Sequence, residues 1–341
     1  MGARHRSLPD RLVRRRLASL AAGARPDHLG VPPAPGALWD AADIAGAPLP
    51  DVATTVRGRS PDGGAAVVDF SFASRGAGTH PGSRTVRGRL FRAADPLAPC
   101  VVLVHGLAAD RPAFEERLAR REWRWGRSAL HLVLPAHGSR RLPGRRSGDA
   151  FLCADPAATR ANLVQATLDA VDCVRWLREQ GTRHVGMVGF SLGGLVACLA
   201  ATRTRLERMV AVTPPADLAW TGTRLVVEGL RRSLGLDRVS PAVAEEQLRG
   251  VIPRFLTPCT RPEDIGLLAA GRDEVVGSGP VLELARAWGV GRTWLVPRGH
   301  LTALVGWGRA GELVAFAQGQ AAPRRRPLPL APASAADAPL L

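Results

Sequence analysis

The chain has 341 residues, of which 46% are hydrophobic and 22% charged, so it can bury a sizeable core and wholesale disorder is excluded. No apolar run approaches the ~18 residues of a membrane span, and we expect no transmembrane segment. The net charge is +16, and all of the 46 Lys and Arg residues are Arg. These Arg residues form no DNA- or RNA-binding signature, so compositional bias explains the positive charge better than a nucleic-acid partner does. Peripheral contact with an anionic membrane is left open.

The two ends of the chain differ in composition from its middle. Residues 1–50 are rich in Arg, Pro and Ala, with one helical pattern at 12–20, and we predict an N-terminal extension. Residues 322–341 predict a disordered Pro/Ala-rich tail, which leaves 51–321 as one domain. Five Cys residues without a C-x-x-C pair favour reduced thiols and a cytoplasmic location. Export through a twin-arginine-like segment at Arg14–Arg16 is the alternative.

Strand and helix patterns alternate through the middle of the chain. Residues 67–72 and 85–91 predict an antiparallel hairpin. Short apolar runs predict further strands, buried on both faces, at 100–104, 130–134, 185–188, 209–213, 265–270 and 293–296. Helical patterns follow at 159–180 and 192–202. This alternation predicts an α/β fold with a mostly parallel sheet covered by helices on both faces.

Residues 214–262 interrupt the alternation of strands and helices. They contain helical patterns at 225–234 and at Ser240-Pro241, where Ser and Pro suit the N-cap and first position of a helix. An insertion of this length above a sheet predicts a helical lid.

Gly189-Phe190-Ser191-Leu192-Gly193 is a G-x-S-x-G motif between a predicted strand and a predicted helix. In that setting a tight turn projects the Ser hydroxyl above the carboxyl edge of the sheet. Side chains at Gly189 or Gly193 would collide with the backbone that passes closely around the serine. Ser191 is therefore the predicted nucleophile.

A Ser hydroxyl becomes a good nucleophile only when a base removes its proton and a carboxylate orients that base. In this motif the acid and then the His follow the Ser in chain order, and of the eight His residues only His300 lies after Ser191. Asp273 ends a predicted strand and is the predicted acid. Asp217 and, less favoured, Glu274 are the fallback acids.

Acyl transfer also needs backbone N–H groups that stabilise an oxyanion. One is predicted at Leu192, directly after the nucleophile. The other is predicted at Leu107 or Ala108, because Gly106 lets the backbone bend there. We expect His105 to be a structural hydrogen-bonding residue rather than a base.

With these landmarks in order, residues 100–318 resemble the α/β-hydrolase superfamily of serine hydrolases. Residues 134–141, Leu-Pro-Ala-His-Gly-Ser-Arg-Arg, are also similar to a poorly characterised bacterial subgroup with an L-P-x-H-G-x-R-R loop. The resemblance implies an eight-stranded sheet, no metal or cofactor, and hydrolysis of a carboxylic ester or related acyl bond in a small-molecule substrate. The alternatives are a thioesterase, lipase or peptidase with the same triad, or a non-catalytic binding protein. The sequence does not predict the oligomeric state.

The loop at 137–149 is unusually rich in Arg. Arg140 and Arg145 follow a predicted strand and could contact a phosphate or carboxylate of the substrate, since Arg binds such groups bidentately. The other interpretation is a solvated loop whose Arg residues pair with Asp149 and Asp155.

Overall fold

The computed structural model describes residues 41–59, 64–76, 80–110, 113–152, 156–222, 241–304 and 307–320. The helical patterns at 12–20 and 225–234 and the predicted tail at 322–341 lie outside these residues, as does most of the predicted N-terminal extension. No helix within the described ranges is long and apolar enough to cross a membrane.

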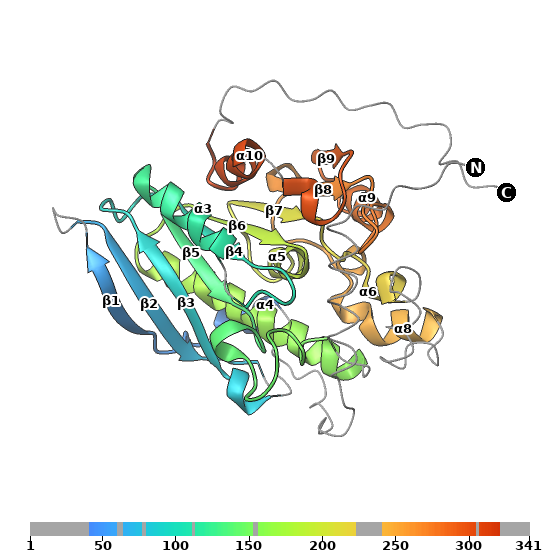
Figure 1. Ribbon diagram of the computed structural model, residues 1–341, viewed down its shortest axis with the longest axis horizontal. Coiled ribbons are helices and arrows are strands. Elements are labelled where there is room, and N and C mark those ends of the chain that lie inside the picture. The colour runs from blue at the N-terminus through green and yellow to red at the C-terminus, as the bar shows by residue number, and fades with distance from the viewer. Residues whose placement is uncertain are drawn as a thin grey trace.

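One sheet organises the described part of the chain (Figure 1). Its strands lie in the order β1-β2-β3-β5-β4-β6-β7-β8-β9. Their bounds are β1 (Ala53–Arg59), β2 (Ala66–Ala73), β3 (Thr85–Arg92), β4 (Cys100–Val104), β5 (Ser128–Val133), β6 (Val185–Phe190), β7 (Arg208–Val212), β8 (Ile265–Ala270) and β9 (Arg292–Val296). The described residues therefore form nine strands rather than the expected eight, and the strand that was not predicted is β1.

Strand pairing confirms a mostly parallel sheet. β2 and β3 form the predicted hairpin and β3 continues antiparallel to β5, whereas the neighbours from β5 to β9 are parallel. β1 pairs antiparallel with β2, and every one of its residues is exposed. A strand without a buried face has no alternation of apolar and polar residues, so the sequence pattern could not predict it.

Helices connect most of these strands. The α-helices are α2 (Ala41–Gly46), α3 (Ala113–Arg124), α4 (Pro156–Glu179), α5 (Leu192–Ala201), α6 (Leu218–Trp220), α8 (Pro241–Leu248), α9 (Gly279–Ala287) and α10 (Trp307–Ala317). The 3-10 helices are η3 (Pro81–Ser83), η4 (Gly138–Arg140), η7 (Arg249–Val251), η8 (Pro253–Phe255), η9 (Pro262–Asp264) and η10 (Leu301–Leu304). The helices α4 and α5 confirm two predictions, and α8 begins at the predicted Pro241. The sequence prediction lacked α3, which is rich in Arg and Glu.

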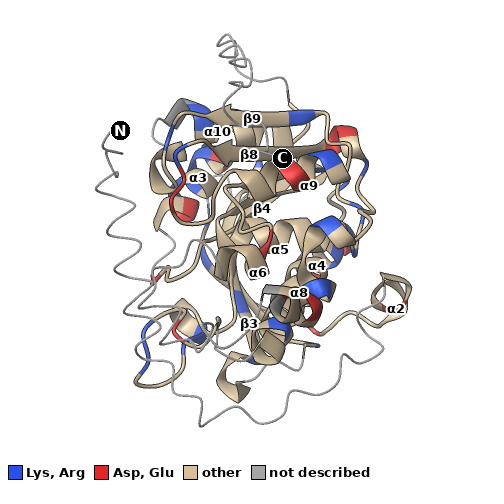
Figure 2. Ribbon diagram, turned by 90° about the vertical axis from the view of Figure 1, so that its right-hand side faces the viewer, with Lys and Arg blue, Asp and Glu red and all other residues tan. Residues whose placement is uncertain are grey.

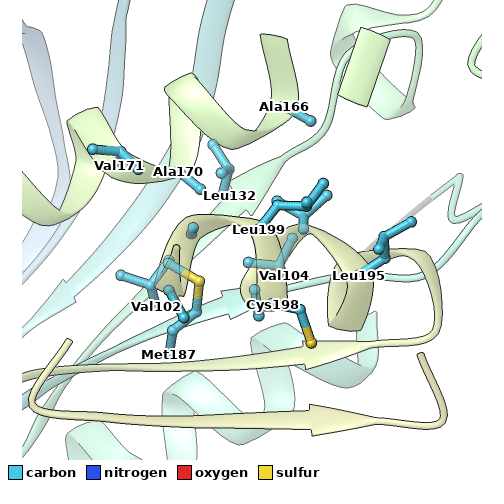
Figure 3. Packing of buried hydrophobic residues seen from close by; sticks show 14 of the residues in the cluster. Val102, Val104, Leu132, Ala166, Ala170, Val171, Met187, Leu195, Cys198 and Leu199 are labelled. Carbon is cyan, nitrogen blue, oxygen red and sulfur yellow. The ribbon is translucent and has the colours of Figure 1, made fainter. Parts of the chain in front are cut away.

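The sheet is covered by helices on both faces, as predicted (Figure 1). On one face α4, α5 and α9 pack over an apolar cluster, in which Val104 of β4 lies close to Leu199 of α5 and Val102 lies close to Met187 of β6 (Figure 3). On the other face α3 and α10 cover a second cluster, to which β4 contributes Val101 and Leu103. Because successive residues of β4 enter opposite clusters, its sequence is apolar throughout.

Part of the predicted lid insertion lies within the described residues. There α8 contacts α6 and also packs against α4. Arg254 forms ion pairs with Asp217, at the N-cap of α6, and with Glu245 of α8, the latter at 2.7 Å. These ion pairs join the two ends of the insertion, whose role as a lid stays a prediction.

Ribbon segments of Arg and of acidic residues are interspersed in the view of Figure 2. Many Arg residues have an acidic partner, as in the pair of Arg89 with Asp69 at 2.6 Å. These pairs do not remove the excess of Arg over acidic residues, and the absence of a nucleic-acid partner stays a prediction.

Candidate active site

Ser191 lies on a strained turn between β6 and α5. Its backbone has φ 51° and ψ −116°, which residues other than Gly rarely adopt, and its amide donates to Val212 O of β7 at 2.8 Å. A Cβ at Gly189 would collide with the Gly193 carbonyl, and a Cβ at Gly193 would collide with the Val104 carbonyl. The turn therefore requires glycine at both positions, as the motif predicts.

Three side chains from separate loops form a chain of hydrogen bonds. His300 Nε2 lies 2.9 Å from Ser191 Oγ, and His300 Nδ1 lies 2.7 Å from Asp273 Oδ2. A carboxylate can only accept, so Nδ1 carries the proton that faces Asp273 and, in the neutral ring, Nε2 accepts from the Ser191 hydroxyl. The side chains of His300 and Asp273 are only 4% and 1% exposed, so little water competes for these bonds.

The loops after β8 and β9 hold the acid and the imidazole. Asp273 Oδ1 accepts from the backbone amides two and three residues further along, at 2.8 and 2.9 Å, which leaves Oδ2 for His300. The two loops are joined because the amide of Arg272 donates to Arg298 O at 2.9 Å. Asp273 and His300 thus lie at carboxyl ends of neighbouring parallel strands, where open α/β sheets place their sites.

The fallback acid Asp217 has other partners. Its Oδ1 accepts from the amide of Trp220 at 2.9 Å and so caps α6, while its Oδ2 is bound by Arg254. The structure brings Asp273, and not Asp217, to His300.

Two backbone amides next to Ser191 have no acceptor within the described residues, those of Leu107 and Leu192. Leu192 is the first residue of α5, and the first N–H groups of a helix have no intrahelical acceptor. Gly106 lies against the serine, because a Cβ there would be 3.4 Å from Ser191 Cβ. This close approach brings the next amide, that of Leu107, to the same edge of the sheet.

His105 fixes the start of the loop that carries Leu107. Its Nδ1 donates to Gly106 O at 2.8 Å, and its Nε2 accepts from the amide of Leu134 at 3.1 Å. Burial lowers the pKa of His105 to about 4, so the ring is neutral at neutral pH. These contacts agree with the structural role expected for His105.

His137 is a residue of this site that the sequence analysis did not single out. Its Nε2 accepts from the amide of Ala108 at 3.2 Å, and its Nδ1 lies 2.8 Å from Pro135 O. The sequence analysis gave the amides of Leu107 and Ala108 as alternative donors to the oxyanion. Because the Ala108 amide donates to His137, the Leu107 amide is the one that stays available. The sequence pattern that could have pointed to His137 is the second His-Gly pair of the chain, which lies in the L-P-x-H-G stretch.

Comparison with protein families gives one match. A family model described as "Alpha/beta hydrolase family" matches residues 101–339, well over half of the chain. The chain belongs to the alpha/beta hydrolase family. Comparison with curated proteins gave no match.

Solved structures share the fold of this alpha/beta hydrolase at low sequence identity. Acetyl xylan esterase 1 from Thermoanaerobacterium sp. JW/SL YS485 is 14% identical, with a TM-score of 0.61 over 89% of this chain and 98% of that one. An acetyl xylan esterase from Paenibacillus sp. R4 is 14% identical, with a TM-score of 0.53 over 88% and 91%. The Pyrococcus horikoshii acylaminoacyl peptidase is 13% identical, with a TM-score of 0.51 over 80% of this chain and 42% of that one.

The structure places Arg140 in the interior of this alpha/beta hydrolase. Its side chain is fully buried and forms an ion pair with Asp169 of α4 at 2.8 Å, and Nη1 donates to Val133 O at 2.8 Å. The prediction that Arg140 contacts a substrate anion is therefore wrong, because protein groups surround its guanidinium. Arg145 is half-buried, and its contact with a substrate stays a prediction.

No three His, Cys, Asp or Glu side chains in the described ranges are grouped so that they could hold a metal ion. Cys100, Cys173 and Cys198 are buried free thiols. Burial raises the pKa of all three, and a protonated thiol is a poor metal ligand.

Proposed function

We propose that this protein is a serine hydrolase that cleaves a carboxylic ester, or a related acyl bond, in a small-molecule substrate. The observation that supports this proposal is the hydrogen-bonded chain from Ser191 through His300 to Asp273. Its three members come from loops after three different strands, and the serine lies on a turn that is strained at φ 51°. Such strain persists only where the surrounding structure imposes it, as is common at active sites.

In the proposed reaction, Ser191 Oγ attacks the acyl carbon while His300 Nε2 accepts the hydroxyl proton and Asp273 stabilises the imidazolium. The amides of Leu107 and Leu192 donate to the oxyanion of the tetrahedral intermediate. His300 then gives the proton to the leaving oxygen, the bond between carbon and that oxygen breaks, and the acyl group stays on Ser191. Water attacks this acyl-enzyme with His300 as base, which releases the acid and returns a proton to Ser191.

A fluorophosphonate probe tests this proposal without knowledge of the substrate, because it reacts with activated serines. We expect the wild-type protein to be labelled and the Ser191→Ala and His300→Ala variants to be unlabelled. A control, Ser71→Ala in β2, should be labelled like the wild type. Absence of labelling in folded wild-type protein would contradict the proposal.

A panel of esters then identifies the preferred acyl group. It should include p-nitrophenyl esters of increasing chain length, an acetylated sugar and a thioester, because two similar structures are named acetyl xylan esterases. On the best substrate, loss of a triad member should reduce kcat by about 10⁴-fold or more. If Ser191→Ala kept more than about a tenth of the wild-type rate, Ser191 would not be the nucleophile.

A further inference from the structure

Residues 137–149, here named the bracing loop, lie against residues 105–110, the oxyanion loop. The amide of Ala108 donates to His137 Nε2 at 3.2 Å. The loops approach closely at Gly148, where a Cβ would lie 2.8 Å from His137 Nε2 and 2.9 Å from the Ala108 nitrogen. Only glycine allows this approach, and the backbone of Gly148 also has a positive φ of 85°.

Ser147 makes a second contact between the bracing loop and the oxyanion loop. Its Oγ–H donates to Ala109 O at 2.6 Å, and the same oxygen accepts from the amide of Gly138 at 2.9 Å. The bracing loop therefore binds an N–H and a C=O of consecutive residues in the oxyanion loop. Two such bonds fix the orientation of the backbone between them.

The His137 ring is itself held in one orientation. It is fully buried, with its centroid 5.0 Å from that of His105 and 5.5 Å from that of Phe151. A carbonyl can only accept, so the 2.8 Å contact with Pro135 O places the proton on Nδ1. Nε2 then has its lone pair free for the Ala108 amide.

The buried ion pair of Arg140 with Asp169 anchors the base of the bracing loop to α4. Arg140 also donates to Val133 O at the end of β5 and, through Nε, to Ser83 O at 3.2 Å. In return, Ser83 Oγ–H donates to Arg140 O at 3.0 Å. The bracing loop is thus fixed to the sheet and to a helix, and it can transmit that rigidity to the oxyanion loop.

Ala108 shows that the oxyanion loop needs such support. Its φ is 64°, a left-handed conformation that is strained for an alanine. The bond from Ala108 N–H to His137 fixes the peptide plane that follows Leu107. The bond from His105 to Gly106 O fixes the plane that contains the Leu107 N–H, because the carbonyl and N–H of a trans peptide point in opposite directions.

We propose that His137 is a positioning residue, which holds the oxyanion loop so that the Leu107 amide is offered to the oxyanion. The proposal rests on the proposed function, since Leu107 is a donor only if Ser191 forms a tetrahedral intermediate. His137 makes no contact with the substrate in this scheme and acts through Ala108.

The test compares His137→Asn with His137→Gln. The Asn amide reaches the place of Nδ1 but not that of Nε2, so the Ala108 amide loses its acceptor, whereas the longer Gln can supply an oxygen there. A 1 Å displacement or loss of one oxyanion donor costs about 10²-fold. We therefore expect His137→Asn to lower kcat on a p-nitrophenyl ester about 100-fold with KM within about threefold, and His137→Gln to restore most of kcat.

A second readout follows the contact itself. Amide hydrogen exchange in the segment 105–110 should be faster in His137→Asn than in His137→Gln or the wild type. The control is His184→Asn, which removes another bond from imidazole to backbone, that of His184 Nε2 to Ala317 O at 2.9 Å, and should change neither kcat nor exchange in that segment. If His137→Asn fails to fold, Ser147→Ala replaces it in the test. This variant removes the bond from Ser147 to Ala109 O, and we expect the same loss of kcat and the same faster exchange in segment 105–110.

The outcomes separate this inference from the proposed function. Unlabelled wild-type protein in the fluorophosphonate assay would overturn both. Labelled wild-type protein together with wild-type kcat in His137→Asn would overturn the inference alone. Equal loss of kcat in the Asn and Gln variants, or a loss that appears in KM rather than in kcat, would also overturn it.

Discussion

Buried His105 should make the folded protein sensitive to acid. Burial lowers the pKa of His105 from 6.5 to about 4, because the charged ring would lose its hydration. Protonation would also turn Nε2 into a donor that faces another donor, the amide of Leu134. The unfolded chain therefore binds a proton more readily than the folded protein, so the stability contributed by His105 is complete above pH 6.5 and is lost as the pH falls towards 4.

The size of the effect follows from these two pKa values. Integrating the difference in bound protons between pH 7 and pH 4.5 gives a loss of about 2 kcal/mol in the free energy of unfolding. Other groups titrate in the same range. Burial raises the pKa of Glu115 to about 7, which has the opposite sign, because the stability of a protonated carboxyl is lost as the pH rises from 4.5 to 7.

A comparison with His105→Gln isolates the contribution of His105. Glutamine offers an acceptor oxygen for the Leu134 amide but does not titrate, whereas Glu115 is the same in both proteins. Urea unfolding at several pH values gives the free energy of each. We expect the stability of the wild type relative to the variant to shrink by about 2 kcal/mol between pH 7 and pH 4.5. A difference that stays constant over this range would refute the reasoning.

Three further predictions concern the site and its support. Asp273→Asn should lower kcat about 10⁴-fold by favouring the wrong imidazole tautomer, whereas Asp217→Asn should leave kcat nearly unchanged; equal losses in steady-state kinetics would contradict the assignment. Arg140→Met leaves the buried Asp169 carboxylate without its cationic partner and should lower the free energy of urea unfolding by about 3–5 kcal/mol. A loss below about 1 kcal/mol, as for exposed ion pairs, would contradict the burial of this ion pair. Gly189→Ala should abolish fluorophosphonate labelling because its Cβ would collide with the backbone of α5, whereas Gly279→Ala, with no atom within 4 Å of its Cβ, should keep it; a labelled Gly189→Ala protein would contradict the strained turn.

The sequence could predict that Ser191, Asp273 and His300 lie together, because each follows a predicted strand and the three occur in the expected chain order. Parallel strands have their carboxyl ends at one edge of the sheet, so side chains directly after β6, β8 and β9 meet there. Ser191 was marked by its two glycines and His300 by being the last histidine. Their separation of 109 positions along the chain did not matter, since the sheet sets the distance between the two side chains.

The sequence could not predict where Arg140 lies. An Arg in a polar loop is usually solvated, because burying a guanidinium is costly unless it is paired. The signal was on the partner element: Asp169 and Asp172 are buried in the middle of the largely apolar α4. Two carboxylates in such a helix require cations, and the structure supplies Arg140 to the first and Arg75 to the second. Neither pairing follows from local spacing.

The position of β9 at the end of the sheet has a consequence for the timing of biosynthesis. A ribosome completes β6 and the turn at Ser191 while β8 and β9 are still to be translated. Until β9 joins the sheet, His300 cannot reach the serine, and an alcohol without a base is a poor nucleophile. The nascent chain therefore carries Ser191 as an ordinary hydroxyl. In the proposed hydrolase, reactivity towards acyl groups arises only when β9 and the loop that carries His300 have been synthesised and β9 has joined the sheet.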